Sequence, residues 1–101
     1  MRERTYPTQQ DEALRRAQAH RIPAILDAAA DRLDRMNPAT AMTERARFVD
    51  IQVSVWDHHG VYNDVAVGRD ITATLIVVRD LPLAGTRAEY ATRLRLAARA
   101  V

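Results

Sequence analysis

Residues 48–78 constrain the fold more than any other part of the chain. They read FVDIQVSVW, DHHG, VYNDVAV, GRD and ITATLIVV, so apolar and β-branched runs alternate with short groups of turn-forming residues. β-Branched and aromatic residues favour strands, whereas glycine, aspartate and asparagine favour turns. The pattern therefore predicts three strands, at residues 48–56, 61–67 and 71–78, joined by two short connections.

The segments that flank this region are rich in alanine and arginine and predict helices. The first carries an apolar stripe at helical spacing, formed by Ile22, Ile25, Leu26, Ala29, Leu33 and Met36. Pro23 interrupts it, which predicts either one kinked helix or two helices. In the second, Thr86 and Glu89 have the spacing of a capping box. Its predicted buried stripe consists of Tyr90, Leu94, Ala97 and Val101.

Together these elements predict a single α+β domain over residues 1–101, with residues 1–7 as a flexible arm. Short connections favour an antiparallel meander of the three strands. The small sheet is expected to pack against the kinked N-terminal helix, or helix pair, and the C-terminal helix.

Composition narrows the function classes. The chain has no cysteine, which excludes disulfides and thiolate chemistry. It shows neither a secretory signal nor a run long enough to span a membrane, which predicts a soluble cytoplasmic protein. All 15 basic residues are arginine, and the net charge is only +2. Because arginine and alanine codons are GC-rich, we expect a GC-rich bacterium or its phage as the source; a phage protein would be cytoplasmic or virion-associated.

The second face of the predicted sheet suggests an interaction surface. Strands one and three of a meander run in the same direction, so Trp56, Ile76 and Val78 are expected at one end of the sheet. The candidate interface comprises Trp56, His58, His59, Tyr62, Ile76 and Val78. The alternative, that the N-terminal helices cover this face, stays open.

Two other functions stay open. Asp57, His58 and His59 carry ligand atoms for a metal-dependent enzyme, but a catalytic zinc site needs about three converging protein ligands. A polar hairpin loop is the simpler interpretation. A nucleic-acid-binding regulator would use Arg87, Arg95 and Arg99 of the last helix.

No sequence motif specifies a reaction or a cofactor. Ser54, the only serine, lacks the G-x-S-x-G pattern that exposes a nucleophile. We therefore predict a non-enzymatic protein-interaction module, an assembly, adaptor or inhibitor protein that associates with itself.

Overall fold

The computed structural model describes residues 9–60 and 65–101, and within these ranges it contains four helices and no strand. Helix α1 spans Gln9–Arg35, α2 spans Glu44–His59, α3 spans Val65–Val78 and α4 spans Arg87–Ala100. The predicted α+β class is therefore wrong, and the domain is all-helical where it is described. None of the described helices combines the length and apolar character that a membrane crossing requires.

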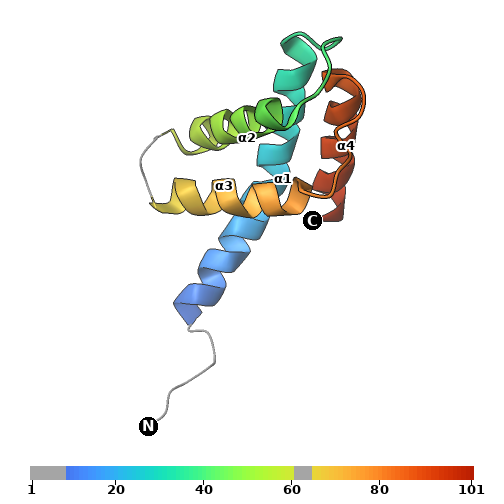
Figure 1. Cartoon of the computed structure of the whole chain (residues 1–101). Helices are drawn as coiled ribbons and strands as arrows, with labels where there is room; N and C mark the ends of the chain where they lie inside the picture. The colour runs from blue at the N-terminus through green and yellow to red at the C-terminus, as the bar shows by residue number, and fades with distance from the viewer. Residues whose placement is uncertain (1–8, 61–64) are drawn as a thin grey trace.

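Helix α1 is the element on which the other three are assembled (Figure 1). Helix α4 packs antiparallel along the C-terminal half of α1 and forms the most extensive helix pair of the fold. Helices α2 and α3 form a second antiparallel pair that lies across α1. The N-terminal turns of α1 project beyond this bundle.

The core lies where α1 meets the other helices. The predicted stripe of α1 is confirmed, since Ile22, Ile25, Leu26, Ala29 and Leu33 are all buried, although Met36 is half exposed. The other helices contribute Ile51, Val55, Val67, Val78, Tyr90, Ala91 and Leu94. Burial of this apolar surface is the main favourable term that holds the four helices together.

The predicted strands at residues 48–56 and 71–78 are helical instead, and so are residues 65–67 of the second predicted strand. Residues 61–64 lie outside the described part. The alternation of apolar and polar residues predicted strands, but it arises because polar residues occupy part of the buried stripe of each helix. Helix α2 buries Asp50, Ile51, Ser54 and Val55. Helix α3 buries Val67, Asp70, Thr74 and Val78. Both sets recur every three to four residues, which is the helical period.

Pro23 neither divides α1 nor ends it, because the helix continues from Gln9 to Arg35. A proline inside a helix removes one backbone hydrogen bond at a cost of about 3 kcal/mol. The buried residues on either side of it, Ile22 and Ile25, pack into the core and offset that cost. The predicted alternative of two separate helices is therefore wrong.

Two loops, residues 36–43 and 79–86, are joined by backbone hydrogen bonds. The Met42 amide donates to the Gly85 carbonyl at 2.9 Å, and the Arg87 amide donates to the Thr40 carbonyl at 2.9 Å. The predicted capping box is confirmed, since the Glu89 amide donates to the Thr86 hydroxyl and the Thr86 amide donates to the Glu89 carboxylate. These bonds satisfy backbone groups that every helix start leaves free.

Candidate functional site

The most extensive polar cluster in the described part of the chain surrounds Asp70 on α3. Its carboxylate is fully buried and accepts hydrogen bonds from two residues of α1. The Arg21 Nε donates to Oδ2 at 2.6 Å, its Nη2 donates to Oδ1 at 3.1 Å, and the Gln18 amide donates to Oδ1 at 3.1 Å. The His59 Nε2, from the end of α2, lies 2.7 Å from Oδ2. One side chain thus joins three helices.

The surroundings of Asp70 keep it ionised. Burial alone would raise its pKa, but hydrogen bonds from Arg21, His59 and Gln18 and the charge of Arg21 outweigh burial and hold the pKa at about 2. A buried carboxylate with this many donors is a stable anion and a poor proton donor or acceptor near neutral pH. The cluster therefore acts first as a joint between α1, α2 and α3.

The sequence contained a partial signal for this cluster. Asp70 is the only acidic residue in the apolar run of residues 65–78, but its position after Gly68 suggested a turn. Gln18 and Arg21 carried no signal, because more than forty residues separate them from Asp70 along the chain. Only the packing of α1 against α3 brings them to it.

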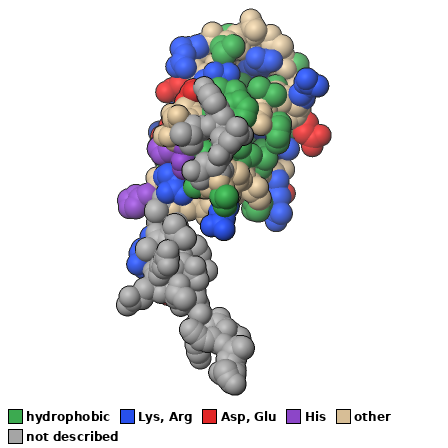
Figure 2. Space-filling model, turned by 90° about the vertical axis from the view of Figure 1, so that its left-hand side faces the viewer, with side chains coloured by type: hydrophobic (Ala, Val, Ile, Leu, Met, Phe, Trp, Pro, Cys, Tyr) green, Lys and Arg blue, Asp and Glu red, His purple; other side chains and the backbone are tan. Residues whose placement is uncertain are grey.

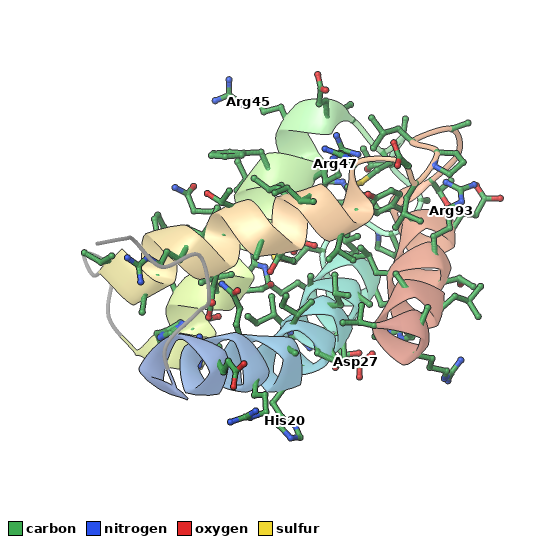
Figure 3. The ribbon with its side chains drawn as sticks, turned by 90° about the horizontal axis from the view of Figure 1, so that it is seen from below. His20, Asp27, Arg45, Arg47 and Arg93 are labelled. Carbon is green, nitrogen blue, oxygen red and sulfur yellow. The ribbon has the colours of Figure 1, made fainter. Side chains whose placement is uncertain are left out.

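The predicted metal ligands do not converge. Asp57, His58 and His59 are consecutive residues at the end of α2, so their side chains diverge by about 100° per residue around the helix axis. His59 turns toward Asp70, whereas Asp57 and His58 are exposed. His20 points away from α2 and α3 (Figure 3). No group of three or more histidine and acidic residues among the described ones is arranged to hold a metal ion.

The predicted interface residues are only partly brought together. Ile76 is 53% exposed, His58 is exposed and Trp56 is half-buried, but Val78 is fully buried in the core. Tyr62 lies outside the described residues. In the antiparallel pair, Trp56 lies in the second half of α2, beside the first half of α3. Ile76 lies in the second half of α3, so the shared sheet end that was expected to unite them does not exist.

Two of the three predicted nucleic-acid-binding arginines contact other residues of the fold. Arg95 lies 2.8 Å from the Asp31 carboxylate and 2.7 Å from that of Asp34, both on α1. Arg87 donates from Nη1 to the Met36 carbonyl at 3.2 Å. Of the three, Arg99 remains exposed near the end of α4. The arginines do not form one basic surface in this arrangement, because acids of α1 neutralise the central one.

An apolar surface that sequence reasoning described only in part covers the outward sides of α2 and α3. We call it the α2–α3 face. It consists of Phe48, Val49, Gln52, Val53 and Trp56 on α2 and of Val65, Gly68, Arg69, Thr72 and Ile76 on α3. Figure 2, seen from the end at which α2 stops and α3 starts, shows hydrophobic side chains side by side on this part of the surface.

Two contacts fix the register of the α2–α3 face. His59 meets Asp70 at one end of the helix pair, and the Arg47 guanidinium lies 3.4 Å from the Val78 carbonyl at the other. The first half of α2 therefore lies beside the second half of α3. Phe48 and Ile76 lie in these two halves, and their side chains are 46% and 53% exposed.

Comparisons with known proteins give no identity. No protein-family model, no curated protein and no solved structure matches this chain.

Proposed function

We propose that this protein is a non-enzymatic interaction module that associates with a second copy of itself through the α2–α3 face. The observation that carries the proposal is the distribution of apolar residues around α3. Its buried side includes the polar Asp70 and Thr74, whereas Val65 and Ile76 are 69% and 53% exposed. Large apolar side chains that stay exposed on neighbouring helices are typical of an interaction surface.

The charge pattern of the face favours a second copy as the partner. Arg69 is the only charged residue in the face, so two copies do not repel each other. A two-fold axis makes the same patch meet itself, and two α3 helices then cross antiparallel. That crossing brings Arg69, near the start of one α3, toward Asp80, just after the end of the other. The α2–α3 face has no cluster of charges that would complement a strongly charged partner.

The association state tests the proposal. Sedimentation velocity of the wild-type protein at high micromolar concentration is expected to show a dimer. Ile76→Asp places a carboxylate in the face, where pairing would bury it without a partner, and is expected to give a monomer with unchanged helical circular dichroism.

Leu96→Asp is the matched control. Leu96 is 58% exposed on α4, outside the α2–α3 face, so its replacement is expected to leave the dimer intact. A wild-type protein that is monomeric at this concentration contradicts the proposal, and so does a dimer that survives Ile76→Asp.

A further inference from the structure

A cavity of about 290 Å³ lies between the end of α1, the first turns of α2 and the start of α4. Its polar lining comes from Arg32, Thr43, Arg45, Asp50 and Arg87. It adjoins the α2–α3 face at Val49, which belongs to both, but its other lining residues lie outside that face. Its size is near the lower end of the range for small-molecule sites, which is about 300 Å³.

One of the residues that line this cavity is a buried carboxylate with an unused oxygen. Asp50 is only 5% exposed, and its Oδ1 accepts a hydrogen bond from the Arg32 Nε at 3.1 Å. Its Oδ2 has no hydrogen-bond partner among the described residues, and the same is true of the buried Nε of Arg87. Buried polar atoms are nearly always hydrogen-bonded, so each of these two unpaired atoms requires an explanation.

The other groups around the cavity are positive. Arg32, Arg45 and Arg87 approach it from three helices, and the first turn of α2 directs the positive end of its helix dipole toward it. Thr43 caps that helix by accepting a hydrogen bond from the Ala46 amide at 3.1 Å. Glu44, the acid of this turn, is exposed and lies 3.8 Å from Arg47. The cavity therefore favours an anion.

A ligand for this cavity has to meet two demands at once. It must accept hydrogen bonds from arginines, and it must donate one to the free oxygen of Asp50. Hydrogen phosphate does both, because it has charged oxygens and keeps one P–OH proton near neutral pH. Sulfate has no proton to donate, so at pH 8, where Asp50 is mostly ionised, its oxygen would face the Asp50 carboxylate without a hydrogen.

We propose that this cavity binds a phosphate compound that carries a hydroxyl proton, with the arginines holding the anionic oxygens and Asp50 accepting the hydroxyl hydrogen. The simplest such compound is hydrogen phosphate itself. A phosphorylated metabolite meets the same demands when its phosphate lies on the arginines and one of its alcohol groups reaches Asp50. The shared chemistry is an anion and a hydroxyl donor in one small molecule.

Calorimetric titration at pH 8 with inorganic phosphate, sodium sulfate and glycerol 3-phosphate tests this assignment. The wild-type protein is expected to bind phosphate about tenfold or more tightly than sulfate, because sulfate leaves the buried carboxylate unpaired. Tighter binding of glycerol 3-phosphate than of phosphate also supports the proposal and identifies an organic phosphate as the source. Equal affinities for phosphate and sulfate, or no binding of either phosphate compound, overturn it.

Variants separate the two demands. In Asp50→Asn the amide is a donor as well as an acceptor, so the preference for phosphate over sulfate is expected to fall to about onefold while sulfate still binds. Arg45→Gln changes an exposed side chain at the rim of the cavity. It is expected to lower the affinities for phosphate and for sulfate by about the same factor. Arg69→Gln, on the α2–α3 face, is the matched control and is expected to change neither affinity. If Arg45→Gln and Arg69→Gln have the same anion affinities, the proposal is contradicted, even if Asp50→Asn does not fold.

Discussion

Two buried carboxylates, Asp50 and Asp70, have their pKa values moved in opposite directions by their surroundings. Burial raises the pKa of Asp50 to about 7, against the opposing hydrogen bond and charge of Arg32. For Asp70 the same effect of burial is outweighed by donors from two other helices, and the pKa falls to about 2. The number of hydrogen bonds that each carboxylate accepts therefore decides whether its pKa is raised or lowered.

The raised pKa of Asp50 predicts a loss of stability with rising pH. Between about pH 4 and 7 the folded protein holds a proton that the unfolded chain has released, so the free energy of unfolding falls across that window. Each pKa unit corresponds to about 1.4 kcal/mol. Asp50→Asn removes this titration. Its stability relative to wild type is therefore expected to improve by about 2–3 kcal/mol from pH 5 to pH 8 in urea denaturation. A constant difference between the two proteins across this window would show that Asp50 titrates normally.

The lowered pKa of Asp70 predicts the opposite behaviour. Above about pH 4 the ionised carboxylate contributes its full stabilisation, which is lost as the pH falls through about 2. Asp70→Asn leaves Arg21 without its partner and is expected to lower the free energy of unfolding by about 3 kcal/mol at pH 7. The difference from wild type should narrow below pH 4. His59→Gln retains a side-chain donor, so it is expected to lower the free energy of unfolding by less than Asp70→Asn does. A larger decrease for His59→Gln would contradict this assignment.

At the scale of the helices, the sequence predicted the parts whose apolar residues agree with the helical period. The stripe of α1 and the capping box of α4 are of this kind, and both are present in the structure. Helices α2 and α3 were predicted as strands because Asp50, Ser54 and Thr74 occupy buried positions while Phe48 and Ile76 are exposed. A prediction that assigns apolar residues to the core is wrong where the buried side of a helix is partly polar.

The candidate sites were less predictable than the helices. Asp70 and Asp50 gain their character from Arg21 and Arg32, which lie 49 and 18 residues away along the chain. No local motif encodes such pairs. His59 was noted in the sequence for its neighbours Asp57 and His58, yet its hydrogen-bonding partner is Asp70.

The start of α4 depends on a glycine. Gly85 has φ +101°, which residues with a side chain rarely adopt, and an added Cβ would collide with the Glu89 carboxylate of the capping box. Gly85→Ala is therefore expected to lower the free energy of unfolding by about 1–3 kcal/mol in chemical denaturation. Gly68→Ala is the contrast, since Gly68 lies within α3 with open space around it, and it is expected to raise stability by about 0.5–1 kcal/mol at low protein concentration. Equal effects of the two changes would contradict this reasoning.

At the scale of the whole molecule, self-association predicts a melting temperature that depends on concentration. A dimer that forms only from folded chains stabilises them by mass action. The melting temperature of the wild-type protein is therefore expected to rise with protein concentration in differential scanning calorimetry. That of Ile76→Asp should stay constant, because this variant is expected to remain a monomer. A flat response for the wild-type protein would count against a dimer.

The packing of α4 along α1 has a consequence for synthesis on the ribosome. The buried stripe of α1, which includes Ile25, Leu26 and Leu33, is covered in part by Tyr90 and Leu94 of α4. A nascent chain that has released α1, α2 and α3 still lacks this cover, so the core closes only after α4 has left the exit tunnel. Until then the apolar side of α1 is available to chaperones and proteases. A chain that is cut short before residue 87 would keep that exposed stripe and become a target for degradation.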